Sequence, residues 1–296
     1  MNIYSKIHTL MFTLYGFCLK VSYDVRGHLG LPCLHPDPEK KGNVVVSLTS
    51  YGRRVEKSIV YYTLVSILRQ TQLPDRIILW LNQDKWNDDN LPTRLKYLRD
   101  HHGVEIRFCE DIRSYTKLIP TLQLCPDDII ITVDDDIIYH RTVVRSMMER
   151  YHQHPDCIVG FGCLRPCLNK IGKIQKYRKW PLAADGETSL SVFPLGYNVV
   201  LYPPHTLHED VFDRKVYQSL CPYADDVWFW LQGLRKGTQH HCLVTKRIHN
   251  HSFDALYQLF HRGSALMHVN LAEQNNEKQM EACMDYYKMD IKSYLE

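Results

Sequence analysis

The sequence predicts an α/β protein with a mostly parallel, mixed central sheet that is flanked by helices. Short apolar runs alternate with helical patterns between Val44 and Val133, which is typical of βαβ units. The run Ile129–Val133 is almost wholly apolar, as expected of a strand that is covered on both faces. The 296 residues are 45% hydrophobic and 23% charged, an ordinary globular mixture that can bury a sizeable core.

The chain begins with an apolar stretch, Ile7–Leu19, between Lys6 and Lys20. It is too short for a spanning helix, which needs about 20 apolar residues. Three interpretations stay open: a helix packed on the domain, an interfacial membrane helix, or a cleaved signal or signal-anchor. The Pro-rich segment 31–42 is typical of a linker, so residues 1–42 are assigned to an N-terminal helix and linker.

The remaining residues, 43–296, are expected to form one domain with two halves. In the first half, 43–140, apolar runs place strands at residues 44–48, 77–81, 104–108 and 129–133. Apolar side chains at helical spacing predict helices around residues 60–68, 91–98 and 115–122. In the second half, 141–296, we expect a helix at 143–151, strands at 157–161 and 199–204, and a helix at 225–234 closed by Gly237. Residues 162–187 are rich in Lys, Arg, Gly and Pro and are predicted to be a loop or mobile flap.

Three consecutive aspartates, Asp134, Asp135 and Asp136, directly follow the buried run at 129–133. In an extended chain, Asp134 and Asp136 would share a face and Asp135 would oppose them. Parallel α/β sheets bind ligands outside the carboxyl ends of their strands. Because crowded carboxylates repel one another, a divalent cation such as Mg²⁺ or Mn²⁺ would relieve the repulsion, and both ions favour oxygen ligands. The alternative is a solvated turn, or the cap of a helix that starts near Arg141.

The segment Ile129–Asp136 resembles the Asp-x-Asp signature of GT-A glycosyltransferases. From about Val44 to Gly237, further segments resemble bacterial glycosyltransferases of the family-2-like kind: Ser47–Tyr51, Ile78–Leu81, Phe108–Asp111, Lys117–Pro120 and Ala224–Trp228. The resemblance implies a GT-A fold, in which a Rossmann-like nucleotide-sugar-binding half (43–140) joins an acceptor half (141–296).

The same resemblance implies a role for each matching residue. The nucleotide base and ribose would contact Thr49, Ser50, Tyr51 and Arg54, with Asp111 near the base and Lys117 near the phosphates. The ribose or the sugar would face Asp134, with Asp135 also in the substrate site. The metal, Mn²⁺ or Mg²⁺, would be held by Asp136 and Asp134. The base that deprotonates the acceptor hydroxyl would be Asp226 or its neighbour Asp225.

Several of these residues also have plainer interpretations. Asp225 and Asp226 could cap a helix, Lys117 could lie on a solvated helix face, and Arg54 taken alone is a surface charge. The segment His249–His251 could supply a third metal ligand or serve on the surface or in the core. The aromatic run Trp228–Trp230 could be core or could stack on an acceptor sugar. One departure from the family is Gly196-Tyr197-Asn198-Val199, where related sequences often carry a glycine-rich turn.

The expected function is metal-dependent and inverting glycosyl transfer from a nucleotide-sugar, with a UDP-sugar as the expected donor. The acceptor would be a saccharide or a lipid-linked saccharide, in surface polysaccharide or lipopolysaccharide synthesis. A metal-dependent phosphohydrolase or nucleotidyltransferase also places Asp pairs after parallel strands, and a non-catalytic carbohydrate-binding protein could share the fold. No Gly-x-x-x-x-Gly-Lys-Ser/Thr loop occurs, which counts against nucleoside-triphosphate chemistry.

The net charge and the cysteines indicate which partners the protein binds and in which compartment it works. The formal net charge of +3 is too small to indicate a nucleic-acid partner. The ten cysteines include no Cys-x-x-Cys pair, so neither a structural zinc site nor a disulfide framework is expected. This pattern favours a reducing compartment. We therefore expect a cytoplasmic protein, with peripheral contact at the inner face of the membrane as an open alternative.

Overall fold

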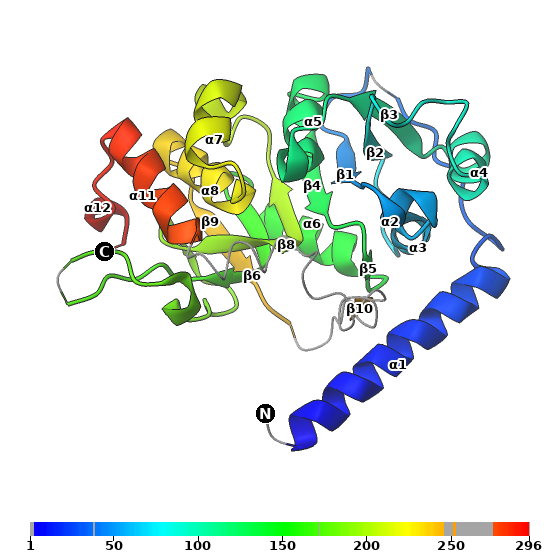
Figure 1. The fold of residues 1–296 in the computed structure, drawn as a ribbon, viewed down its shortest axis with the longest axis horizontal. Helices are drawn as coiled ribbons and strands as arrows, with labels where there is room; N and C mark the ends of the chain where they lie inside the picture. Colours follow the sequence, from blue (N-terminus) through cyan, green and yellow to red (C-terminus); the bar gives the residue numbers. More distant parts are fainter. Residues whose placement is uncertain (1–2, 38, 171, 246–250, 253–274, 296) are drawn as a thin grey trace. The chain divides into compact units, whose positions relative to one another are not determined.

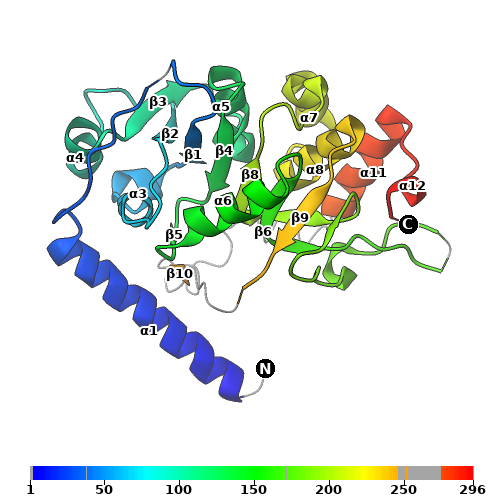
Figure 2. The ribbon, with the colours of Figure 1, turned by 180° about the vertical axis from the view of Figure 1, so that it is seen from behind.

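The computed structural model describes residues 3–37, 39–170, 172–245, 251–252 and 275–295. The fold is α/β with a mixed sheet flanked by helices, which confirms the predicted fold class (Figures 1 and 2). The chain divides into two compact units, each assembled from separate stretches. The first unit comprises Met1–Asp111, Asp134–Ser146 and Lys246–Ser264; the second comprises Ile112–Val133, Met147–Thr245 and Ala265–Glu296. The predicted boundary between functional halves at residue 140 stays a prediction.

The first unit contains three parallel strands in the order β3-β2-β1, namely β1 (Val44–Thr49), β2 (Arg76–Asn82) and β3 (Glu105–Cys109). Between and before them lie the helices α1 (Ile3–Arg26), α2 (Arg53–Glu56), α3 (Val60–Leu68) and α4 (Thr93–His102). The short strands β5 (Ile137–Ile138) and β10 (His251–Ser252) form an antiparallel pair. Since β1, β2 and β3 are parallel, their carboxyl ends lie at one edge of this sheet.

The second unit has five strands in the order β4-β8-β6-β9-β7: β4 (Ile129–Val133), β6 (Ile158–Leu164), β7 (Thr188–Ser189), β8 (Phe193–Tyr202) and β9 (His240–Leu243). Only the β6–β9 pair is parallel among the paired strands described in this unit.

The α-helices of the second unit are α5 (Ile119–Leu124), α7 (Arg214–Leu220), α8 (Asp225–Lys236), α11 (Asn275–Tyr287) and α12 (Lys292–Leu295). Helix α6 (Val143–Gln153) starts in the first unit and ends in the second. Short 3-10 helices occur at Arg113–Lys117, Tyr177–Lys179 and Glu209–Phe212.

Every predicted strand is present, and the strand expected at 199–204 and the helix expected around 115–122 differ most from the prediction. Strand β8 begins at Phe193, earlier than predicted, because Pro194 and Gly196 interrupt the apolar pattern without ending the strand. The expected helix at 115–122 is a 3-10 helix followed by the separate helix α5. Pro120 explains that break: it lacks an N–H group, so it fits the first turn of α5 but not the interior of a longer helix.

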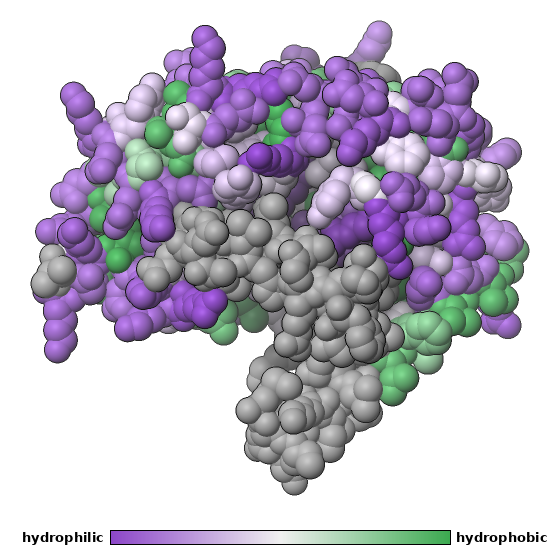
Figure 3. Space-filling model, viewed as in Figure 1, coloured by the Kyte–Doolittle hydropathy of each residue, from purple (hydrophilic) through white to green (hydrophobic). Residues whose placement is uncertain are grey.

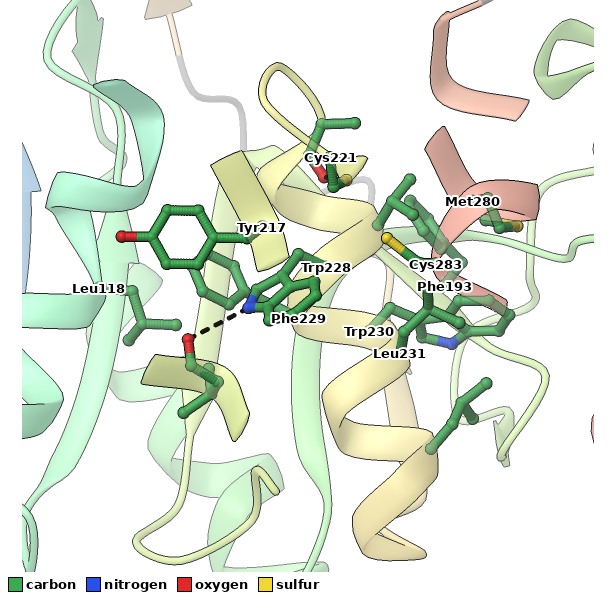
Figure 4. Packing of buried hydrophobic residues seen from close by; sticks show 14 of the residues in the cluster. Leu118, Phe193, Tyr217, Cys221, Trp228, Phe229, Trp230, Leu231, Met280 and Cys283 are labelled. Atoms are coloured by element: carbon green, nitrogen blue, oxygen red, sulfur yellow. Dashed lines mark hydrogen bonds between the residues drawn. The ribbon is translucent and has the colours of Figure 1, made fainter. Parts of the chain in front are cut away.

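An extensive apolar cluster lies in the second unit, where α8 packs against β8 and α11 (Figure 4). Trp228 and Trp230 of α8 are 0% and 2% exposed, which confirms the core interpretation of these aromatic residues. Their indole N–H groups donate to the backbone oxygens of Val211 (3.2 Å) and Val192 (2.9 Å). A buried indole without such an acceptor would destabilise the core, so both rings have fixed positions.

Candidate functional site

The carboxyl edge of the β1–β3 sheet carries several of the predicted substrate-binding residues. Thr49 ends β1 and pairs with Trp80 of β2, while Asn82 at the end of β2 pairs with Cys109 of β3. The Thr49 hydroxyl donates to the Trp80 backbone oxygen (3.1 Å), so its side chain reinforces the sheet edge. Asp111 is exposed two residues beyond β3. The sheet thus presents the ends of all three strands on one side, where α/β proteins bind ligands.

The centre of the candidate site is an acidic cluster tied to the loop after β1. Ser50 Oγ donates to Asp135 Oδ2 at 2.5 Å. The Arg54 guanidinium donates to Asp135 Oδ1 (2.5 Å) and to Asp136 Oδ2 (2.7 Å), so one cation bridges two carboxylates. The exposed Tyr51 ring lies with its centroid 5.7 Å from the guanidinium carbon. The structure therefore brings Ser50, Tyr51 and Arg54 to the aspartates, as their shared predicted site requires.

The aspartates form a turn rather than an extended segment, and this corrects one expectation. Asp135 and Asp136 lie in the turn between β4 and β5, and both face Arg54. The prediction that Asp134 and Asp136 share a face opposite Asp135 is therefore wrong. Two carboxylates that are only 4% and 8% exposed need a common counter-charge, and the turn allows Arg54 to reach both. The same burial contradicts the interpretation of Asp135 and Asp136 as a solvated turn.

Helix α3 holds the segment that follows the aspartates. Thr63 Oγ1 donates to the backbone oxygen of Ile137 (2.8 Å), and Ser66 Oγ accepts from the backbone N–H of Tyr139 (3.0 Å). One turn later, Gln70 Nε2 donates to the backbone oxygen of His140 (2.9 Å). These three supporting residues were not predicted from the sequence. The sequence does show a pattern: polar residues at positions 63, 66 and 70 recur at i, i+3 and i+7, the first two within an otherwise apolar helix and the third just beyond its end.

A second contact fixes the start of the turn. The Tyr139 hydroxyl accepts from the backbone N–H of Asp134 at 2.8 Å, and Tyr139 itself is buried. Asp134 is half-buried, whereas its two neighbours are buried. Burial raises the pKa of Asp135 to about 6, and the nearby Arg54 guanidinium opposes that rise. The turn is thus held by its backbone as well as by the shared cation.

The acidic cluster fits a divalent cation in charge and in donor type. Its carboxylate oxygens already surround one cation, the Arg54 guanidinium, and Mg²⁺ and Mn²⁺ favour the same oxygen donors. No group of three or more His, Cys, Asp or Glu side chains that could hold a metal occurs among the described residues. Mg²⁺ commonly takes one or two carboxylates and completes its shell with water and phosphate oxygens. The assignment of Asp134 and Asp136 as metal ligands stays a prediction.

The suggested third ligand lies largely outside the described residues. His249 and Asn250 are not part of the described chain, and of His251 only the backbone is described. That backbone pairs with Ile138, two residues beyond Asp136. The pairing places the backbone of His251 and Ser252 beside the strand that follows the acidic turn.

A separate polar cluster occurs in the second unit around the N-terminus of α8. Lys117 Nζ donates to the backbone oxygen of Gly196 (2.9 Å) and lies 3.3 Å from Asp225 Oδ2. Asp226 Oδ2 accepts from the backbone N–H of Gly196 at 3.1 Å. The N-cap of α8 is Ala224, so neither aspartate occupies the capping position. Lys117 is buried, which contradicts its interpretation as a solvated surface residue; its predicted role at the phosphates stays a prediction.

Asp226 has the electrostatic character of a group that gains and loses a proton near neutral pH. Burial and the adjacent Asp225 carboxylate raise the pKa of Asp226 to about 7, while Lys117 opposes the rise. The Asp226 side chain lines a small hollow, with Tyr202 and His240 among its other walls. Both ring nitrogens of the buried His240 have no hydrogen-bond partner among the described residues.

Gly196 has a definite structural reason to be glycine. A Cβ atom at this position would lie 2.4 Å from Asp226 Oδ1, closer than two such atoms can approach. Its backbone N–H and carbonyl oxygen bind Asp226 and Lys117 respectively. The segment that departs from the family pattern thus contains the residue that joins Lys117 to Asp226.

Comparison with known proteins leaves the family undetermined. No protein-family model and no curated protein matches the sequence. Among solved structures, the chain is similar to CMP:2-keto-3-deoxy-manno-octonic acid synthetase complexed with CTP, with 10% identity and a TM-score of 0.44. The match covers 75% of this chain and 98% of that one. No role is transferred from this likeness, so the resemblance to GT-A glycosyltransferases stays a prediction from sequence.

Proposed function

We propose that this protein is a glycosyltransferase that moves a sugar from a nucleotide-sugar to a saccharide or lipid-linked saccharide acceptor. The observation that carries the proposal is the buried Asp135–Asp136 pair, bridged by Arg54 at the carboxyl edge of parallel strands. Such an edge is where α/β sheets bind nucleotides and other ligands. A UDP-sugar is the proposed donor and surface polysaccharide or lipopolysaccharide synthesis the proposed setting, both by the sequence resemblance.

The groups around the acidic turn match the parts of such a donor. The exposed Tyr51 ring offers a face for stacking, and the exposed Asp111 carboxylate can accept hydrogen bonds from a base. Ser50 fixes the orientation of Asp135, while Arg54 supplies a planar cation suited to phosphate oxygens. A divalent cation bound by Asp134 and Asp136 would supply Lewis-acid stabilisation of the diphosphate.

The transfer itself needs a base for the acceptor hydroxyl, and we propose Asp226. The acceptor oxygen forms a bond to C1 of the sugar while the bond from C1 to the phosphate oxygen breaks. The electron pair leaves with the nucleoside diphosphate, and the acceptor proton passes to the Asp226 carboxylate. A single displacement of this kind inverts the configuration at C1. Because its pKa is about 7, Asp226 suits this exchange near neutral pH, and a positioned base contributes roughly 10²- to 10⁴-fold.

A cytoplasmic reaction is proposed from the state of the cysteines. All ten cysteines lie in the described part of the chain as thiols, none of them in a disulfide. Several of these thiols, including Cys163, Cys221, Cys242 and Cys283, are buried. Buried thiols without disulfides are typical of proteins that stay in a reducing compartment.

The test is to incubate the purified protein with Mn²⁺ and a panel of nucleotide-sugars, and to identify products by mass spectrometry. We expect slow release of a nucleoside diphosphate from one of them, and the Asp136→Ala variant should lower that rate by about 100-fold. Asp88→Ala is the matched control, because Asp88 is an exposed acid of the same unit that pairs only with half-buried Arg99 among the described contacts.

Other products would point to other functions. Release of orthophosphate from simple phosphate esters would indicate a phosphohydrolase, and release of pyrophosphate from a nucleoside triphosphate a nucleotidyltransferase. Binding of a saccharide with no turnover of any nucleotide-sugar would indicate the non-catalytic alternative. Each of these results would replace the glycosyltransferase proposal.

A further inference from the structure

Helix α1 contacts the first unit with one of its faces. Asp24 accepts hydrogen bonds from the Tyr62 hydroxyl (2.6 Å) and from Arg94 (2.8 Å). Lys20 Nζ lies 5.3 Å from the centroid of the Tyr62 ring, and Gly16 is buried. These contacts fix which face of α1 is turned toward the protein.

The neighbouring face of α1 is apolar and exposed. Leu14, Phe17, Val21 and Val25 are 55%, 50%, 44% and 65% exposed, and we call these four residues the α1 stripe. At 100° per residue they fall within about 80° of the helix circumference, on the side away from Gly16. In Figure 3, hydrophobic surface gathers along α1 at the lower right.

Such a stripe is unusual on a helix that meets water. A surface helix normally turns charged and polar residues to the solvent, whereas a contiguous apolar patch marks an interface with a protein or a membrane. No helix in the described part of the chain is long and apolar enough to span a bilayer. The remaining membrane arrangement is a helix that lies in the plane of the interface.

The charges beside the stripe select the kind of partner. Asp24 is the single acidic residue of α1, and Arg94 pairs with it. Exposed Arg26 ends α1 next to Val25 in sequence, and exposed Arg69 binds the backbone oxygen of Arg26 at that end of the helix (3.0 Å). A second copy of α1 would bring these cations together without acids to match them. An anionic lipid surface would neutralise them instead.

We propose that α1 lies in the headgroup region of an anionic membrane, with the α1 stripe among the acyl chains. Arg26 and Arg69 then face the lipid phosphates. The apolar side chains and the cations act together in such binding, because each contributes only modestly alone. This inference concerns the first unit alone and does not depend on the reaction that the protein catalyses.

The experiment is vesicle flotation with the full-length protein. We expect the wild type to float with vesicles that contain phosphatidylglycerol in phosphatidylcholine, and to float less with phosphatidylcholine alone. The double variant Phe17→Asp/Val21→Asp should bind the anionic vesicles at least about tenfold more weakly, because it places charge among the acyl chains. The matched control, Thr93→Asp/Gln218→Asp, adds the same charge at exposed polar positions of α4 and α7 and should bind like the wild type.

Two results would overturn the proposal. One is wild-type protein that fails to float with the anionic vesicles. The other is a dimer in light scattering that becomes a monomer in the Phe17→Asp/Val21→Asp variant, which would show that a second copy covers the stripe. Circular dichroism checks that the variant is folded. Its nucleotide-sugar turnover in detergent-free buffer should match the wild type, so a failure of the proposed reaction is visible separately.

Discussion

The two acidic clusters of this protein differ in how their charge is balanced. In the first unit, Asp135 and Asp136 share the Arg54 guanidinium at 2.5 and 2.7 Å. In the second unit, Asp225 lies 3.3 Å from Lys117, and Asp226 receives one backbone N–H from Gly196. The first arrangement keeps two carboxylates together beside a cation, which suits the binding of phosphate and metal. The second leaves Asp226 with a pKa of about 7, which suits proton transfer.

The largest expected effect tests the proton-transfer side of this comparison. Asp226→Asn keeps the shape of the side chain and removes its basicity. Transfer to an acceptor should fall by roughly 10²- to 10⁴-fold, while donor binding should change less than twofold or so. Single-turnover rates and a thermal-shift titration with the donor measure the two quantities. A variant that keeps its rate would remove Asp226 from the chemistry and leave the clusters without distinct roles.

The next effect tests the binding side. Arg54→Ala leaves two buried carboxylates without their shared cation, so we expect the free energy of unfolding to fall by about 2–4 kcal/mol. Mn²⁺ should restore part of this loss, because it can take the place of the guanidinium charge. Urea unfolding with and without Mn²⁺ measures both changes. Arg53→Ala is the control, since Arg53 is an exposed neighbour on the same short helix.

An equal loss in Arg54→Ala and Arg53→Ala would contradict this account of the acidic turn. The free energy of unfolding could instead fall in Arg54→Ala alone, with no recovery in Mn²⁺. That result would show that a metal ion does not take the place of the guanidinium. Arg54 would then be a structural counter-ion alone.

The smallest expected effect is a shift in the pH dependence of the rate, which tests why the pKa of Asp226 is raised. As a base, Asp226 must be ionised, so the rate should rise with pH and level off above about 7. Asp225→Asn removes the like charge that helps to raise the pKa of Asp226, so the rise should move to lower pH, by up to about one unit. A pH–rate profile from about pH 5 to 9, roughly the range in which such a group titrates, measures this shift. An unchanged or upward-shifted profile would contradict the assigned cause.

The sequence predicted those parts of the fold that depend on local pattern. The apolar runs correctly predicted β1 to β4. The predicted end of α8 at Gly237 is confirmed, because this glycine adopts the left-handed conformation that is typical of a helix C-cap (φ 79°). The acidic residues were found because they follow a buried strand. The early start of β8 was not predicted, because Pro194 and Gly196 break the hydrophobic pattern by which a strand is recognised in a sequence.

What the sequence could not supply was the long-range pairing. Arg54 lies about eighty residues before Asp135, and no local pattern shows that it reaches both carboxylates. The turn geometry follows from that pairing, so the expected faces of the triplet were wrong. Lys117 and Asp225 are likewise distant in sequence, and their ion pair shows only in the folded chain. The functional roles of all these residues stay predictions.

The pairing of β5 with β10 has a consequence for how the protein is made. Ile137 and Ile138 acquire their antiparallel partner only when His251 and Ser252 have been synthesised. Translation proceeds at about 5–20 residues per second, so the segment beside the acidic turn waits several seconds on the ribosome for its partner strand. Stretches of the second unit are synthesised between Ile138 and His251, which both belong to the first unit. A nascent chain released before residue 251 would lack this pairing.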